Sequence, residues 1–181
     1  MAASNVYLVP IDFSKTSLTA LDYAVRLARE NKMELQLIHV IPAPPPLTME
    51  NGAADFLQDY YDPSEKSAVK QLKRLAQRKK LGSGKHRFVV IKRGEPARVI
   101  ADHAKKSRAS LIIMGSHGRT GLKRLMLGSI AERTLRYARC PVLIVKVGVG
   151  LWRRRAAANP SREKPMARVM TCVVPLDFSS S

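Results

Sequence analysis

The fold is decided by the stretch Leu111-Ile-Ile-Met-Gly-Ser-His-Gly-Arg-Thr-Gly-Leu-Lys-Arg-Leu-Met-Leu-Gly-Ser129. Its first four residues form an unbroken apolar run, which is typical of a strand buried on both faces of a parallel sheet. A glycine-rich, basic loop follows, and Ser129 begins a segment with helical spacing that continues to about Arg139. A buried strand that leads through a loop into a helix is the repeating unit of α/β proteins, so we expect that class.

The same alternation of strand and helix continues on both sides of this stretch. Strands are expected at about 6–11, 33–41, 86–92, 111–114 and 141–145, where apolar runs lie between turn residues. Helices are expected after residue 14, after Pro63, after Gly94 and from Ser129, with an irregular connection at 42–62. We therefore predict an α/β fold, a doubly wound, five-stranded parallel sheet with helices on both faces. Of the flavodoxin-like and Rossmann-like forms, the flavodoxin-like strand order is preferred.

The chain divides into three segments. Residues 1–147 are expected to form one domain, 148–168 a basic linker, and 169–181 the first strand of an incomplete second copy. The last expectation comes from Val173-Val-Pro-Leu-Asp-Phe-Ser179, which repeats Leu8-Val-Pro-Ile-Asp-Phe-Ser14 apart from exchanges among Val, Leu and Ile. Such self-similarity indicates an internal repeat, here of a tandem-domain protein shortened after its second copy begins. We expect the extra strand to pair with an open sheet edge of its own or of a neighbouring subunit.

Composition limits the classes of function. With 45% hydrophobic and 25% charged residues, the 181-residue chain is typical of a globular protein with one core. It has no apolar run of the roughly 20 residues that a membrane helix needs, and no secretory signal, so we expect a cytoplasmic protein. Cys140 and Cys172 have no neighbouring ligand cluster, which argues against a metal site and a disulfide framework. The net charge of +18 favours association with polyanions or acidic ligands.

The end of the fourth expected strand has the features of a phosphate site. Ligands of open α/β sheets bind at the carboxyl ends of the strands. Gly115 and Gly118 would let the backbone approach a bulky group, and Gly128 and Ser129 would present free amide groups at a helix N-terminus, which attracts anions. Asp12 ends the first strand at the same edge of the sheet. The spacing Gly-x2-Gly-x9-Gly-Ser predicts a phosphate cradle, with a flexible surface loop as the alternative.

At these residues the sequence resembles the universal stress proteins, in the branch that binds ATP. The resemblance covers residues 5–146 and implies a flavodoxin-like fold, in agreement with the alternation above, and ATP as cofactor, alone or with Mg²⁺. One departure is Ser110, where the family often has Asp; it lies at the entry of a strand, away from the expected nucleotide. The segments that carry the resemblance are Val9-Pro-Ile-Asp-Phe-Ser14, Gly94-Glu-Pro96, Ile113-Met-Gly-Ser-His-Gly-Arg-Thr-Gly121, Gly128-Ser-Ile-Ala-Glu132 and Cys140-Pro-Val-Leu-Ile-Val145.

The resemblance also assigns residues to the nucleotide and a surface to a partner. Residues at the ends of the first two strands would flank the adenosine, the end of the fourth strand would line the nucleoside, and the remaining residues would surround the phosphates. It further implies a homodimer joined through the strand 141–146. The implied cofactor-binding residues are Pro10, Ile11, Asp12, Val40, Met114, Gly115, His117, Gly118, Gly128, Ser129 and Ile130.

The sequence shows no motif for catalysis at this site. Leu81-Gly-Ser-Gly-Lys85 precedes a strand instead of following one, so it does not fit a phosphate-binding P-loop, and no G-x-S-x-G elbow occurs. Phosphoryl transfer depends on metal ions and a positioned nucleophile, and Asp12 is the one carboxylate expected near the phosphates. We expect a nucleotide-responsive regulator of the stress response and not an enzyme, although slow ATP hydrolysis is compatible with this site.

Several interpretations stay open. Asp12 could act only as a cap of the first helix, and His117 could be an exposed loop residue without a ligand. The basic residues Arg119, Lys123 and Arg124, and the basic helix at 66–80, could be solvated surface. The competing function is a polyanion-binding protein, in which the basic surface attracts nucleic acid or an anionic membrane. Nucleic-acid binding would depend steeply on salt, and the sequence lacks the aromatic residues of a single-strand stacking surface.

Overall fold

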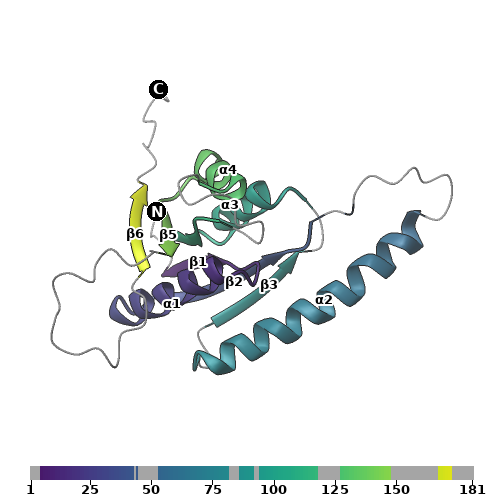
Figure 1. Ribbon diagram of the computed structural model, residues 1–181, viewed down its shortest axis with the longest axis horizontal. Coiled ribbons are helices and arrows are strands. Elements are labelled where there is room, and N and C mark those ends of the chain that lie inside the picture. The colour runs from purple at the N-terminus through teal and green to yellow at the C-terminus, as the bar shows by residue number, and fades with distance from the viewer. Residues whose placement is uncertain are drawn as a thin grey trace.

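The computed structural model describes residues 5–42, 44, 53–81, 86–91, 94–117, 127–147 and 167–172. In this part of the chain, a six-stranded sheet lies between helices on both faces (Figure 1). Strands and helices alternate along the chain as the apolar periodicity predicts. The elements are β1 (Val6–Pro10), α1 (Lys15–Glu30), β2 (Glu34–Val40), α2 (Ala53–Arg78), β3 (His86–Ile91), α3 (Pro96–Lys106), β4 (Leu111–Gly115), α4 (Ser129–Tyr137), β5 (Val142–Val147) and β6 (Ala167–Cys172).

The strand order is β3-β2-β1-β4-β5-β6, with β1 to β5 parallel and β6 antiparallel to β5. The predicted doubly wound α/β class is confirmed. Among its parallel strands the order is 3-2-1-4-5, which is the Rossmann order, whereas the flavodoxin order that we preferred is 2-1-3-4-5. The expected count of five strands is also corrected, because the sheet gains β6 at its edge.

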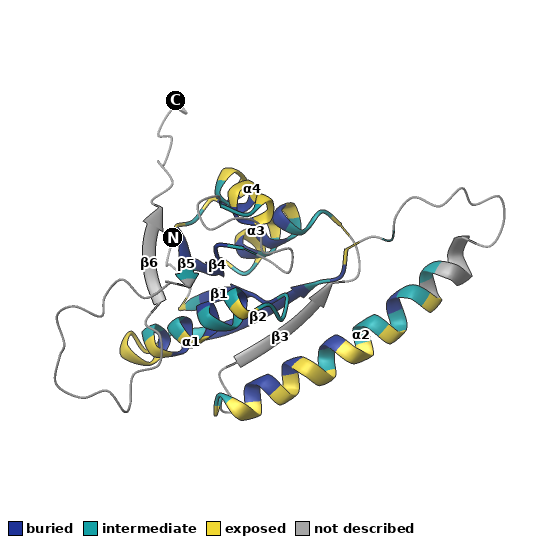
Figure 2. Cartoon of the chain, in the orientation of Figure 1, coloured by how far each residue is buried: buried dark blue, intermediate teal, exposed yellow. Residues whose placement is uncertain are grey.

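Each face of the sheet has its own core, and alternate residues of one strand contribute to both. In β1, Tyr7 and Val9 pack with residues of α1 and α2, while Leu8 packs with residues of α3 and α4. Leu8 and Val9 are fully buried. Figure 2 shows the central strands buried and the outer faces of the helices exposed. Because both faces of the sheet are covered, the central strands β1 and β4 are apolar runs without charged residues, which is why the sequence predicts a parallel sheet.

Helix α2 begins earlier than predicted. We expected an irregular connection at 42–62 and a helix after Pro63, but α2 begins at Ala53 and continues through Pro63. A proline inside a helix removes one backbone hydrogen bond and usually ends the helix. Here the hydroxyl of Ser64 donates to the carbonyl of Tyr60 over 2.9 Å, and Tyr61 is buried beside the proline. These local contacts hold the turn in place, so the proline marks no boundary.

The C-terminal strand β6 covers the outer edge of β5. The two strands pair from Val142 with Cys172 to Val147 with Ala167. We expected the segment 169–176 to pair with a sheet edge, and its described residues 169–172 do so as part of β6, while the repeat at 173–179 lies outside the described residues. With β4 on one side and β6 on the other, β5 has no free edge, so the homodimer expected through 141–146 conflicts with this arrangement.

The described helices include none that is both long enough and apolar enough to cross a membrane.

Candidate functional site

The order of the strands reverses between β1 and β4, so their carboxyl ends form the switch point of the sheet. From β1 the chain passes through α1 to β2 on one side, and from β4 it passes through α4 to β5 on the other. In open α/β sheets, ligands bind at such a switch point. The predicted residues at the ends of β1 and β4 therefore meet at one edge of the sheet, as the sequence implied.

The loop from β1 to α1 is held in a defined shape. A carboxylate oxygen of Asp12 accepts the backbone N–H of Ser14 at 3.0 Å, and Phe13 between them has a φ of 63°, in the left-handed region. Ser14 is the N-cap of α1, because its hydroxyl accepts the N–H of Ser17 at 3.2 Å. Ser14, and not Asp12, is therefore the residue that caps the first helix. Asp12 instead fixes the turn that leads into it.

A buried histidine that is not among the predicted site residues supports this loop. His39 lies at the end of β2 with 8% of its surface exposed, and its Nδ1 is 2.6 Å from the carbonyl oxygen of Ile11. The ring of Phe13 lies 4.8 Å from the His39 ring, centroid to centroid. The N–H of Ile11 also donates to the carbonyl of Ile38 at 2.8 Å. The predicted residues Ile11 and Asp12 are thus positioned by β2, next to Val40 at the same strand end.

Gly115 packs against helix α1. A Cβ atom at this position would lie 2.8 Å from the carbonyl carbon of Thr16 and 3.0 Å from the nitrogen of Ser17. We predicted that Gly115 gives a ligand access to the backbone, but the space beside it is filled by the first turn of α1. The contact is reinforced by the hydroxyl of Thr16, which donates to the carbonyl of His117. Gly115 therefore allows the end of β4 to pack closely against the first turn of α1.

Helix α4 begins next to the end of β4 and has no side-chain cap. The N–H of Gly128 donates to the carbonyl of Ser116 at 2.8 Å, so the loop between them is closed at its base. Gly128 is the N-cap of α4 and makes no side-chain hydrogen bond to the first turn. By contrast, α3 is capped by Glu95, whose carboxylate accepts the N–H groups of Ala97 and Arg98. The amide groups at the start of α4 carry partial positive charge without a capping oxygen from Gly128.

His117 projects from the same strand end. Its Nδ1 is 2.9 Å from the hydroxyl of Ser116, while its Nε2 is buried and has no hydrogen-bond partner among the described residues. If the Ser116 hydroxyl donates to Nδ1, the proton of the neutral ring is on Nε2, which is then a donor. His117 is half-buried, so it is not the exposed loop residue of the alternative interpretation. Gly118 and the basic residues Arg119, Lys123 and Arg124 lie outside the described residues.

The remaining predicted residues divide by exposure. Pro10 and Ile11 are buried, Val40 is half-buried, and Ser129 and Ile130 are exposed at the start of α4. The side chain of Met114 is buried in the core beneath α3 and α4, so only its backbone is left to line a ligand. The structure thus brings together the described members of the predicted set at one edge.

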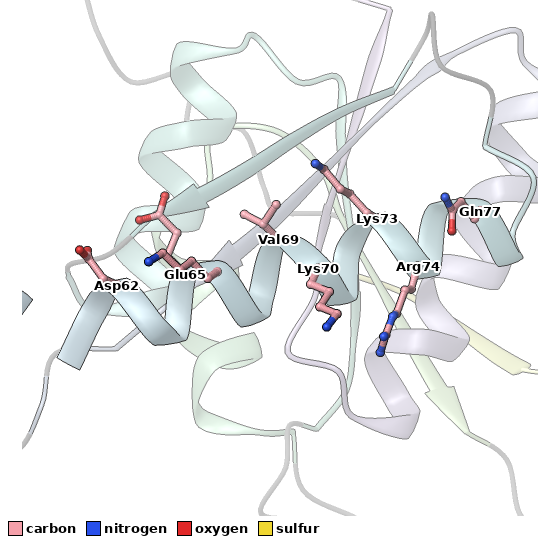
Figure 3. A pocket seen from close by; sticks show the side chains of 8 residues that line it. Asp62, Glu65, Val69, Lys70, Lys73, Arg74 and Gln77 are labelled. Atoms are coloured by element: carbon pink, nitrogen blue, oxygen red, sulfur yellow. The ribbon is translucent and has the colours of Figure 1, made fainter. Parts of the chain in front are cut away.

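Two hollows among the described residues lie away from this edge. One, of about 690 Å³, lies along α2 and is lined by Lys66, Lys70, Lys73 and Arg74 among others (Figure 3). A smaller one, of about 250 Å³, lies at the amino ends of β1 and β2, next to Lys106. Within the described ranges, no three His, Cys, Asp or Glu side chains are grouped to hold a metal ion. The loop after His117 is outside those ranges, and the switch point is characterised by the contacts of its backbone given above.

Fold and site together define a doubly wound α/β protein with an uncapped helix start at its switch point. Comparison with known proteins narrows this class: the model of the universal stress protein family matches residues 6–146. The chain belongs to the universal stress protein family.

Relatives and solved structures agree with this assignment. Universal stress protein YxiE of Bacillus subtilis is 38% identical over 146 residues, which cover 78% of this chain and 99% of YxiE. Universal stress protein MJ0531 of Methanocaldococcus jannaschii is 35% identical, with 78% of this chain and 84% of MJ0531 covered. The solved structure of MJ0577 matches with a TM-score of 0.69 at 26% identity, covering 82% of this chain and all of that one. A universal stress protein solved in complex with cAMP matches with a TM-score of 0.56 at 25% identity, covering 80% of this chain and 98% of that one.

Proposed function

We propose that this chain binds an adenine nucleotide, with ATP as the preferred ligand, at the switch point formed by the carboxyl ends of β1 and β4. One observation carries the proposal: the first turn of α4 starts at Gly128 without a side-chain cap and is fixed beside β4 by the hydrogen bond to Ser116. Bare amide groups at a helix N-terminus bind phosphate through their donors and the helix dipole. The match to a universal stress protein in complex with cAMP, an adenine nucleotide, supports the choice of ligand.

The other predicted residues would contact the nucleotide around the first turn of α4. The phosphates would contact the backbone of Ser129 and Ile130 and the Nε2 of His117, which has no partner among the described residues. The adenosine would lie toward Asp12 and Val40, over the loop that His39 and Phe13 support. ATP is proposed alone or with Mg²⁺ held by its phosphates. The protein would act as a nucleotide-responsive regulator of the stress response, in the ATP-binding branch of its family, and not as an enzyme.

The experiment replaces the bare cap by a charged one. In Gly128→Asp, the carboxylate would accept the first-turn amides and repel phosphate, so we expect ATP binding to be lost. The empty protein should unfold at the same temperature as the parent or slightly above it, because Asp is preferred to Gly at an N-cap by a few tenths of a kcal/mol. ATP at about 100 times its dissociation constant should stabilise the parent by about 2.7 kcal/mol, which is roughly 5–10 °C in a domain of this size.

The matched control is Gln77→Glu, which adds the same charge at an exposed position of α2. It should keep the full thermal shift with ATP. A Gly128→Asp variant that keeps the parent's ATP shift would refute the assigned site. Repeated ATP turnover that is abolished in Asp12→Asn would instead contradict the proposal that the protein is a regulator and not an enzyme.

A further inference from the structure

The exposed face of α2 carries a row of cations that the nucleotide site does not use. The row consists of Lys66, Lys70, Lys73 and Arg74, which we call the basic ridge; all four are exposed. Their spacing of three and four residues puts them on one side of the helix. Figure 2 shows the opposite side of α2 buried against the sheet. There Ala68, Leu72, Leu75 and Ala76 are buried, so the orientation of the ridge toward solvent is fixed by the core.

No ridge residue belongs to an ion pair that the structure shows within the described part of the chain. Ion pairs seen among the described residues include Lys79 with Asp22, Arg133 with Glu95 and Arg136 with Glu132, and none of these three involves the ridge. Like charges three and four residues apart on a helix repel each other. The acidic residues of this face, Asp62 and Glu65, lie at its N-terminal end (Figure 3). A polyanion laid along the ridge would relieve the repulsion among its four cations.

We propose that the basic ridge binds the phosphate backbone of a nucleic-acid duplex without reading its sequence. From Lys66 to Arg74 the helix rises by about 12 Å. A duplex carries about one phosphate charge per 1.7 Å of its axis, so it offers several phosphates over that length. Three of the four cations are lysines, which contact phosphates as flexible point charges and do not require a fixed geometry. All four side chains of the ridge are exposed, so an extended phosphate backbone can reach them along the length of the helix.

The same face does not fit the other polyanions. Helices that bind a membrane surface insert an apolar face into the bilayer, but the apolar face of α2 is buried in the protein, with Leu72 fully buried. Proteins that bind single strands stack bases on aromatic side chains. The side chains that line the hollow on α2 are charged or polar apart from Val69, and none of them is aromatic. A duplex, bound through its phosphates alone, is therefore the occupant that this chemistry favours.

The test measures binding of a fluorescently labelled 20-base-pair DNA duplex by anisotropy in 25–200 mM KCl. The ridge variant is Lys66→Gln, Lys70→Gln, Lys73→Gln and Arg74→Gln together. The matched control removes four exposed cations elsewhere, as Lys32→Gln, Lys105→Gln, Lys106→Gln and Arg139→Gln. Loss of four phosphate contacts should lower the slope of log affinity against log salt by about 3.6 and weaken binding at 50 mM roughly 100-fold or more. In the control variant, the slope of log affinity against log salt should differ from that of the parent by no more than about 0.9, the value for one phosphate contact.

Three results would overturn the proposal. They are an equal loss in the ridge variant and the control, an unchanged slope in the ridge variant, and ridge-dependent binding to phosphatidylserine vesicles without binding to the duplex. Urea midpoints confirm that both variants are folded, and if the fourfold variant is not, Lys70→Gln alone should lower the slope by about 0.9. The ridge variant should keep the parent's thermal shift with ATP, so failure of this proposal is distinguishable from failure of the nucleotide site.

Discussion

Gly115→Ala tests whether the contact between β4 and the first turn of α1 holds the candidate site together. The new Cβ would lie 2.8 Å from the carbonyl carbon of Thr16, whereas an ordinary contact begins at 3.4 Å. The helix must therefore recede by about 0.6 Å, which is the difference between these two distances. It cannot do so freely, because Thr16 donates to His117 and the buried Ser17 is bonded to the cap residue Ser14.

The expected cost follows from these contacts. Overpacking of this kind costs about 1–3 kcal/mol, and weakening the Thr16 hydrogen bond adds about 1 kcal/mol. Alanine also lowers the conformational entropy of the unfolded chain, which stabilises the folded state by about 0.4–1 kcal/mol. We expect a net loss of roughly 1–3 kcal/mol in the free energy of unfolding, measured in urea without nucleotide. If Gly115 served only to admit a ligand, the empty variant would unfold at the parent's midpoint, and that result would refute the packing role.

Three further predictions concern stability and assembly. Lys32 and Lys80 follow helices and have φ values of 56° and 52°, which favour glycine. Lys32→Gly and Lys80→Gly should each raise the free energy of unfolding, measured in urea, by about 0.5 kcal/mol. As a control, Lys70→Gly inside α2 should lower it by about 1 kcal/mol. Burial, and then a nearby lysine, lower the pKa of His103 from 6.5. The unfolded chain therefore takes up this proton first, and stability should fall as the pH drops below about 6.5. In His103→Gln the free energy of unfolding should fall less as the pH drops. If it falls as much as in the parent, His103 is not the source of this pH dependence. Deleting residues 167–181 should free the edge of β5 and raise the mass in light scattering to that of a dimer, whereas a monomer would show that this edge is not an association surface.

The sequence predicts the alternating strands and helices well because the burial of a segment determines the pattern of apolar residues within that same segment. The run Leu111–Met114 is apolar at every position since both faces of β4 are covered, and four consecutive positions suffice to show it. The order of the strands has no such local pattern. The side of β1 on which each later strand is added depends on contacts between residues that are distant in the sequence. For this reason the sequence did not predict the Rossmann order of the strands. The start of α2 was missed for a different reason, because Pro63 is a strong local signal that Tyr61 and Ser64 override.

The candidate site was predictable where the backbone itself carries the chemistry. Gly128 and Ser129 mark a helix start without a capping side chain, and the structure has such a start. The role of Gly115 was not predictable from the sequence. The residue type is the same whether a glycine makes room for a ligand or for a neighbouring helix. His39 was missed because a single histidine in an apolar strand resembles a core residue, and only its contact with Ile11 shows that it supports the loop.

The two proposed anion sites depend on different physical interactions, and salt separates them. At the start of α4 the donors are backbone amides held in place by the bond between Gly128 and Ser116, so binding depends on geometry at short range. On the basic ridge the donors are long, exposed side chains, and binding is driven by the release of counterions. Raising KCl from 50 to 200 mM should therefore weaken duplex binding by roughly 100-fold through the four ridge contacts, while the thermal shift with ATP should change far less. If both fell together, the nucleotide would be held by the protein's overall positive charge of +18 and not by the switch point.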